Sequence, residues 1–206
     1  MRPFSKPSLE EIHSILRAKR GLIVHFSGTP PAGNTTIRYP DDLRNVIAGG
    51  AQDGVPCSVV MPGDVFAGTG ERSSFGTIGV ILALLSNQSL ATASRHDGGS
   101  LWNGTGPREF DERDLTITDV EASLVGRKGH NEWGIRQYLV RGLFVIEPIE
   151  ISKYHSSFGD TPFPYTLEKV RADFPEQRIY SFEGGHIVEL HPRSGPVPAM
   201  HEELYR

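Results

Sequence analysis

NEWGIRQYLVRGLFVIEPIEI, residues 131–151, indicates the β character of this chain most clearly. β-Branched and aromatic residues dominate it, with Gly134 and Gly142 as the interruptions. Because such residues favour extended backbone, this stretch predicts either one long bent strand or a hairpin. At its start, the polar run from His130 to Trp133 is either a catalytic cluster on a strand or an ordinary polar loop.

The chain after this stretch continues the β pattern. YTLEKVRADF, residues 165–174, predicts a helix, and RIYSFEGGHIVELHP, residues 178–192, predicts a hairpin. Its turn falls at Gly184 and Gly185, since paired glycines readily adopt the positive φ angles of a two-residue turn. Residues 193–206 are interrupted by prolines, and we expect them to form an irregular C-terminal tail. Residues 1–192 are then expected to form a single α+β domain.

The N-terminal part is predicted to contain two helices. Ser8 and Glu11 form a capping box, and apolar residues at helical spacing follow, so a helix is expected over Ser8–Lys19. LIVHFSG, residues 22–28, predicts a short strand with His25 near its end. YPDDLRNVIAGG predicts a second helix over Pro40–Ala48, with acidic residues in its first turn and glycines after it.

The middle of the chain alternates apolar runs with polar loops. Pro56–Met61 predicts a strand, and SLATAS, residues 89–94, another. Thr77–Leu85 is apolar throughout, which fits a buried strand or a helix packed on both sides, and we favour the helix. Residues 95–113, which include Trp102, form a long glycine-rich loop that is a candidate lid. A further helix is expected to begin at Thr118 or Asp119.

The order of these elements predicts the fold class. Helices come early and strands dominate the second half without regular alternation. This order favours an α+β domain with a mixed or mostly antiparallel sheet and a few flanking helices over a doubly wound parallel fold. No glycine fingerprint of a dinucleotide-binding fold follows a strand, and GTGERSSFG, residues 68–76, lacks the lysine of a phosphate loop.

Composition predicts a globular protein of the cytoplasm. The chain has 206 residues, 37% hydrophobic and 22% charged, with a net charge of −4. Its one cysteine, Cys57, excludes an intramolecular disulfide, which suits a reducing compartment. The N-terminus lacks the apolar core of a signal peptide, and we expect no membrane partner. The net charge neither indicates nor excludes nucleic acid as a partner. The eight histidines are dispersed, so no metal site is expected.

Four features in a particular order resemble a known family. IVHFSG places His25 near a strand end, YPDDLRNVIAGG is a helix closed by glycines, ERSSFGTIGVIL places Arg72 before an apolar element, and GHNEWGIRQYLVRGLFVIEPIEI places Glu132 before a strand. This order resembles NAD-dependent ADP-ribosyltransferases, particularly the bacterial nucleic-acid-modifying toxins of the DarT kind. The resemblance covers residues 22–152.

The resemblance implies that NAD is bound and consumed as a substrate, and that nucleic acid or protein is the acceptor. It assigns Glu132 as the catalytic residue, and His25 and Arg72 as contacts of the nucleotide. Cleavage of the nicotinamide glycosidic bond develops positive charge on the ribose, which a carboxylate stabilises in the transition state. Tyr39 and Phe75 are the candidates for an aromatic ring stacked on nicotinamide. Trp133 alternates with Glu132 along the strand, so it is expected in the core.

The chain also departs from the family pattern, and each residue has a structural alternative. Residues 29–38 separate His25 from the helix by more than is usual in the family. His25 could be a hydrogen-bonded core histidine, Arg72 a solvated loop residue, and Glu132 a surface residue at a strand start.

Two other functions stay open from the sequence. One is a noncatalytic binding or interaction protein of a bacterial defence or toxin-regulation system, with residues 95–110 as its recognition loop. The other is a metal-dependent hydrolase that uses His186 and His191.

Overall fold

The computed structural model describes residues 6–27, 38–49, 54–64, 76–94, 115–125, 131–155, 159–191, 195–198 and 201–205. Its helices are α1 (Leu9–Lys19), α2 (Asp41–Ile47), α4 (Ile117–Ser123), α5 (Leu167–Asp173) and α6 (His201–Tyr205). Its strands are β1 (Leu22–Phe26), β2 (Val55–Val60), β3 (Ile78–Leu84), β4 (Leu90–Ser94), β5 (Glu132–Ile135), β6 (Tyr138–Val145), β7 (Glu150–His155), β8 (Gly159–Pro164), β9 (Ile179–Glu183), β10 (His186–His191) and β11 (Gly195–Pro198).

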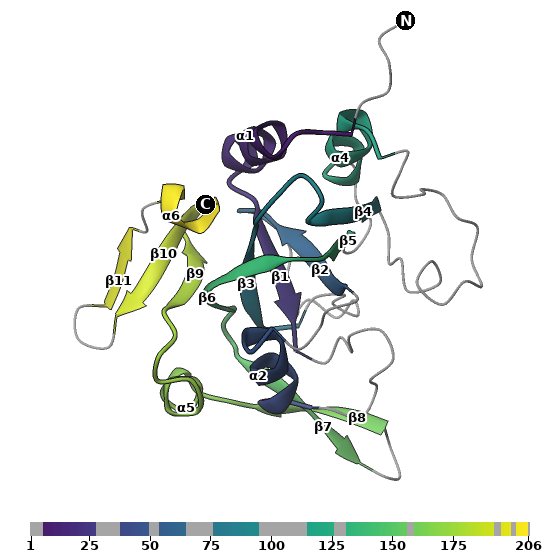
Figure 1. The fold of residues 1–206 in the computed structure, drawn as a ribbon. Helices are drawn as coiled ribbons and strands as arrows, with labels where there is room; N and C mark the ends of the chain where they lie inside the picture. The colour runs from purple at the N-terminus through teal and green to yellow at the C-terminus, as the bar shows by residue number, and fades with distance from the viewer. Residues whose placement is uncertain are drawn as a thin grey trace, which may run out of the picture.

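Nine of these strands form one sheet, and β7 and β8 form a separate pair (Figure 1). The order in the large sheet is β11-β10-β9-β6-β3-β1-β2-β5-β4. Neighbouring strands run antiparallel except β6 and β9, which are parallel. The α+β fold with a mostly antiparallel mixed sheet is therefore confirmed.

Several predicted elements form for the reasons that the sequence gives. The Ser8 hydroxyl accepts from the Glu11 amide, and the Glu11 carboxylate accepts from the Ser8 amide, so the capping box starts α1 as predicted. Gly184 and Gly185 adopt φ angles of 55° and 79° at the turn between β9 and β10. Gly49 adopts a φ of 75° two residues after the end of α2. These local signals operate within a few residues, which is why the sequence alone reveals them.

The helix predicted over Thr77–Leu85 is wrong, because Ile78–Leu84 is strand β3. Every residue of β3 is buried, since the strand lies inside the sheet with β1 and β6 as neighbours and both faces are covered. A fully buried strand is apolar at each position, so its sequence has no alternation to distinguish it from a buried helix.

Residues 131–151 form neither one bent strand nor a hairpin. β5 pairs with β2 and β4, whereas β6 pairs with β3 and β9. Gln137, with a φ of 50°, lies in the short connection between β5 and β6. The chain therefore crosses from one half of the sheet to the other at this point.

The C-terminal residues are more regular than expected. β11 pairs with β10 at the edge of the sheet, and α6 follows it. Leu204 and Tyr205 are each 3% exposed. The boundary expected at residue 192 therefore does not separate an irregular tail from the fold, because apolar side chains beyond it are buried in the core.

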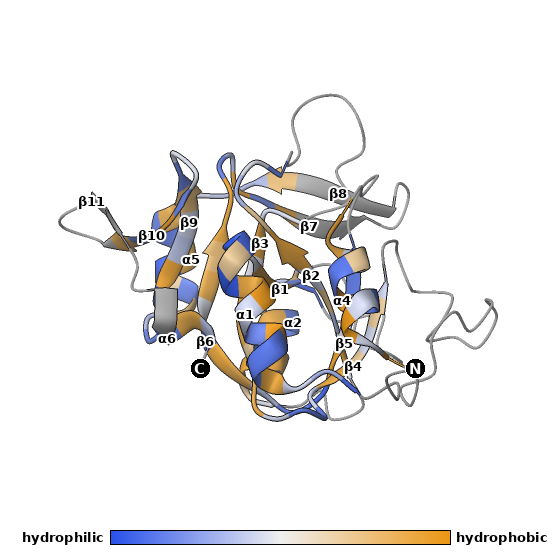
Figure 2. Cartoon of the chain, turned by 90° about the horizontal axis from the view of Figure 1, so that it is seen from above, coloured by the Kyte–Doolittle hydropathy of each residue, from blue (hydrophilic) through white to orange (hydrophobic). Residues whose placement is uncertain are grey.

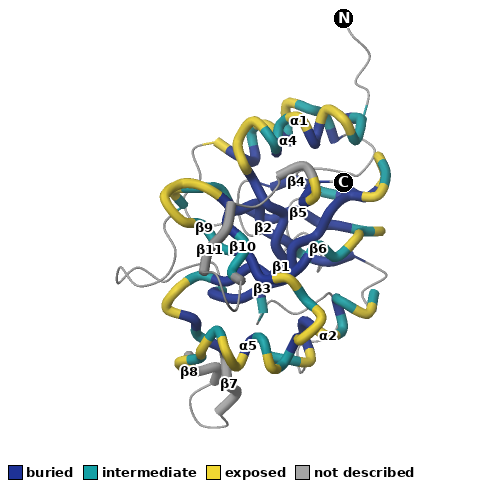
Figure 3. Tube along the Cα trace, turned by 90° about the vertical axis from the view of Figure 1, so that its left-hand side faces the viewer, coloured by how far each residue is buried: buried dark blue, intermediate teal, exposed yellow. Residues whose placement is uncertain are grey.

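Two hydrophobic clusters lie on opposite faces of the central strands. Along β1, Ile23 belongs to the larger cluster, while Leu22, Val24 and Phe26 belong to the smaller one. The larger cluster also contains buried side chains of α1, α2, α4 and α5. Hydrophobic colour follows the central strands in Figure 2, and the same strands are buried in Figure 3, where the helices expose their outer sides. His25 alternates with Val24 and Phe26, so it faces the helix-covered side.

Candidate functional site

Strand β2 changes its pairing partner halfway along its length. Its second half pairs with β1, from Val60 opposite Leu22 to Ser58 opposite Val24. Its first half pairs with β5, and the last recorded pair joins Cys57 to Trp133. We call this change of partner, between Cys57 and Ser58, the branch point. Buried backbone groups that lose a ladder partner here need other hydrogen bonds.

Two side chains supply hydrogen bonds to β2 on either side of the branch point. Towards β1, the Nδ1 atom of His25 lies 2.8 Å from the carbonyl oxygen of Pro56. Towards β5, the amide of Val59 donates to the Oδ1 atom of Asn131 at 2.8 Å. Both side chains are fully buried. The branch point thus places buried polar side chains among the apolar residues of the central strands.

The surroundings of His25 determine its protonation state. Because a carbonyl oxygen can only accept, Nδ1 carries the proton and Nε2 presents a lone pair. Burial lowers the pKa of His25, although the Pro56 carbonyl and the negative charge of Asp42 oppose that shift. Within the described part of the chain, Nε2 is buried and has no hydrogen-bond partner. The neutral ring therefore offers one unused acceptor at the branch point.

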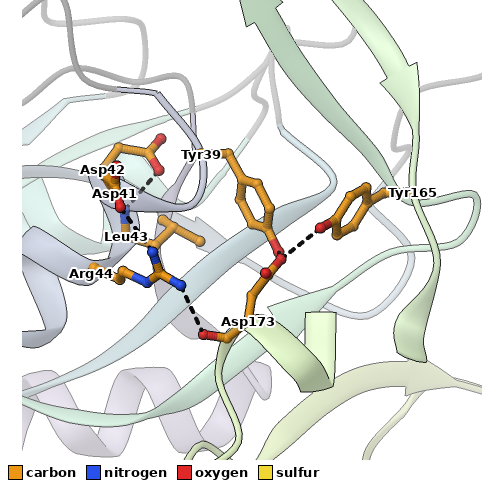
Figure 4. Close-up of polar contacts among 7 residues, drawn as sticks. All are labelled: Tyr39, Asp41, Asp42, Leu43, Arg44, Tyr165 and Asp173. Carbon is orange, nitrogen blue, oxygen red and sulfur yellow. Dashed lines mark hydrogen bonds and ion pairs between the residues drawn. The ribbon is translucent and has the colours of Figure 1, made fainter. Parts of the chain in front are cut away.

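Asp42 is the carboxylate near this histidine. It is 2% exposed and lies in the first turn of α2, where the helix dipole favours negative charge. Its Oδ2 atom accepts from the Ser27 hydroxyl at 2.7 Å, and its Oδ1 atom accepts from the Leu43 amide at 2.7 Å. Figure 4 shows the start of α2 from which this carboxylate projects. Asp42 thereby links the end of β1 to α2.

Two residues at the start of β5, Asn131 just before it and Trp133 within it, have a structural role. Asn131 donates through Nδ2 to the Ser123 carbonyl at 3.2 Å, and the Trp133 indole donates to the Ser123 hydroxyl at 2.9 Å. Trp133 is fully buried, as its alternation with Glu132 predicts. Asn131 and Trp133 therefore anchor α4, whose last residue is Ser123, to the sheet.

Glu132 is buried rather than exposed, so its alternative as a solvated residue at a strand start is wrong. Only 7% of it is exposed, and it pairs with Ser94 of β4. Extended by one residue beyond Cys57 and Trp133, the register of β2 and β5 places it level with Ser58. The negative charge of Glu132 also affects Cys57. Burial is the main cause that raises the pKa of this thiol well above its usual value, and the charge of Glu132 raises it further.

His25 on β1 and Glu132 on β5 lie on the two strands that flank β2 at the branch point, but they do not share a face of the sheet. Extended by one residue beyond the recorded pairs, Val24 with Ser58 and Cys57 with Trp133, the register places His25 level with Cys57 and Glu132 level with Ser58. Side chains on adjacent levels of a continuous sheet point to opposite faces. The convergence of the two side chains that the sequence predicts is therefore not seen on either face.

Tyr39 belongs to a different cluster, shown in Figure 4. Its hydroxyl donates to Asp173 Oδ2 at 2.8 Å, and the hydroxyl of Tyr165 donates to the same oxygen at 2.7 Å. The two rings meet edge to face with centroids 5.3 Å apart. Burial and the Asp173 carboxylate raise the pKa of Tyr39. These contacts connect the start of α2 to α5.

The other predicted site residues, Arg72 and Phe75, lie outside the described residues, as do His130 and the loop at 95–113. Sequence reasoning missed the roles of Asp42 and Asn131. The sequence explains Asp42 only as an acidic residue in the first turn of a helix. No pattern near it in the sequence indicates its contact with Ser27. The sequence contains a weak signal for Asn131, because the side-chain amide of an asparagine next to a strand can replace a main-chain hydrogen bond of the sheet.

The described part of the chain contains neither a candidate metal site nor a candidate membrane-spanning helix. No three His, Cys, Asp or Glu side chains there are grouped in a way that could hold a metal ion. Its helices include none with the length and apolar character needed to cross a membrane. No family model, curated protein or solved structure matches this chain.

Proposed function

We propose that the branch point binds NAD and that the protein is an ADP-ribosyltransferase-like enzyme, with nucleic acid or protein as the acceptor. The observation that supports this is the buried Nε2 atom of His25, an acceptor that has no partner among the described residues. A buried carboxylate, that of Glu132, lies one residue level away in the sheet. A buried polar group without a hydrogen-bond partner costs about 1–3 kcal/mol of stability. A ligand that donates a hydrogen bond to it removes this cost, which favours binding of the ligand.

The two residues have separate tasks in this proposal. A hydroxyl of the NAD ribose donates to Nε2 of His25, whose Nδ1 proton is held by Pro56. Glu132 lies beside the ribose that carries nicotinamide. The glycosidic C–N bond breaks, its electron pair leaves with nicotinamide, and the carboxylate stabilises the positive charge left on the ribose. The acceptor's nucleophile then bonds to the ribose carbon and releases its proton to Glu132 or to water.

The register constrains where the nucleotide lies. Since His25 and Glu132 belong to opposite faces of a continuous sheet, and β2 lies between β1 and β5, one ligand can reach both only if β2 separates from one of these neighbours near the branch point. His25 is fully buried, so binding also requires that its surroundings open. The proposal therefore includes local movement of the strands when NAD enters.

The experiment is nicotinamide release from NAD by the wild type and three variants. Glu132→Gln keeps the shape of the side chain and removes the charge, and we expect a loss of about 10²–10³ in kcat, as for removal of a transition-state electrostatic contact. His25→Gln is expected to raise KM more than it lowers kcat, because ribose binding is present in the ground state as well. Glu176→Gln, at an exposed site, is the matched control.

Unfolding in urea establishes first that each variant is folded. Release by Glu132→Gln at the rate of the wild type would overturn the role of this carboxylate. Absence of release from the wild type, in assays that supply both nucleic acid and protein acceptors, would overturn the proposed activity.

A further inference from the structure

Strands β6 and β9 pair over a short length and then separate. Their parallel pairing is recorded at Leu143 with Ile179 and at Phe144 with Tyr180. Beyond that point the Ser181 hydroxyl donates to the carbonyl oxygen of Val145 at 2.8 Å. A groove of about 370 Å³ opens here, bordered by the exit of β6, by β9 and β10, and by the start of α5. We call it the β9 groove. Its size is within the range of ligand pockets.

The walls of the β9 groove are mainly apolar. They come from four elements of the fold and comprise Ile146, Leu167, Phe182, Val188 and Leu190. Apart from Val188, these side chains are only half-buried, so apolar surface is accessible along the groove. Such surface gains free energy when another apolar side chain removes it from water.

Two carboxylates give the groove its charge. Glu147 and Glu183 line it, and both are exposed. No ion pair is recorded for either of them with another described residue, in contrast to Glu189 and Glu203, which both pair with Arg178. The groove therefore combines an apolar surface with negative charge that its own described surroundings do not neutralise.

The groove is held in shape by contacts between its elements. Arg171 of α5 donates to the Leu190 carbonyl on β10 at 2.7 Å, and Arg20 donates to the Gly185 carbonyl in the hairpin turn at 2.6 Å. The Arg171 guanidinium is thus already engaged with the main chain of a groove residue. A groove fixed before binding loses little conformational entropy when it is filled.

We propose that the β9 groove binds a segment of a partner protein that carries an apolar side chain next to lysine or arginine. The apolar side chain fills the space against Leu167 and Leu190, and the basic group lies between Glu147 and Glu183. Charge complementarity selects this occupant over an acidic or purely apolar segment. The inference is independent of NAD binding, because the groove involves neither His25 nor Glu132.

The test begins with selection of phage-displayed random linear peptides on the folded wild type. We expect enrichment of sequences with leucine, isoleucine or phenylalanine beside lysine or arginine. An enriched peptide, labelled with fluorescein, is then titrated by anisotropy against the wild type, the double variant Glu147→Gln/Glu183→Gln and the exposed control Glu176→Gln. We expect the double variant to bind at least tenfold more weakly, and the control to bind as the wild type does.

Three outcomes would overturn the inference. One is that no peptide is enriched, or that the enriched peptides are acidic. Another is equal affinity of the double variant and the wild type. The third is that the wild type self-associates in sedimentation and that the double variant does not, since the occupant would then be a second copy of this chain.

Discussion

The sharpest structural prediction concerns Asn131, the side chain that supplies hydrogen bonds where β5 parts from β2. It is fully buried, accepts from the Val59 amide at 2.8 Å and donates to the Ser123 carbonyl at 3.2 Å. Asn131→Ala removes both contacts from buried main-chain groups. Each buried group that loses its partner costs about 1–3 kcal/mol, so for the two groups together we expect the free energy of unfolding to fall by about 2–6 kcal/mol.

Asn87 offers a matched control. Its Oδ1 atom accepts from the amide of Leu9 at 2.6 Å, but the residue is exposed, so water can replace it. Asn87→Ala is therefore expected to cost about 1 kcal/mol. Urea unfolding followed by tryptophan fluorescence gives both values. If Asn131→Ala costs no more than Asn87→Ala, the structural role assigned to the branch point is refuted.

Three further predictions concern groups whose environment is defined by burial. Because burial lowers the pKa of His25 from 6.5, the unfolded chain binds more protons than the folded chain as the pH falls towards and below that value, and stability declines. His25→Gln should therefore flatten the fall in the free energy of unfolding between about pH 7 and 5, measured by urea titration at each pH. Tyr39→Phe should lower the free energy of unfolding by about 1–2 kcal/mol in urea titrations, and by more than Tyr165→Phe, since Tyr39 is the more deeply buried of the two. Cys57 is buried and its raised pKa keeps it a thiol, so a disulfide reagent should modify it only after denaturation, and modification of the folded protein would contradict the structure.

Local signals in the sequence predict much of the fold. The capping box of α1, the helix α2 and the glycine turn between β9 and β10 each depend on residues within one turn of each other. β3 was predicted wrongly because a strand buried on both faces has no periodicity. The positions of β5 and β6 could not be derived, since pairing across the sheet depends on residues far apart in the chain.

The candidate site was predictable only as a set of residue types. His25 and Glu132 could be named only from the order of short motifs along the chain, which resembles that of ADP-ribosyltransferases. Their relation to one another depends on the register of β1, β2 and β5, which the sequence does not encode locally. The contact of Asp42 with Ser27 joins two elements, and it too becomes visible only in the structure.

The most direct test of the proposed function is thermal unfolding of the wild type and Glu132→Gln, with and without millimolar NAD. A ligand at about 100 times its dissociation constant stabilises the folded state by about 2.7 kcal/mol. We predict that Tm rises with NAD in both proteins, because Glu132 acts mainly on the transition state, while only the wild type releases nicotinamide at an appreciable rate. If Tm changes in neither protein, the branch point does not bind NAD, and a noncatalytic binding function becomes the better explanation of this fold.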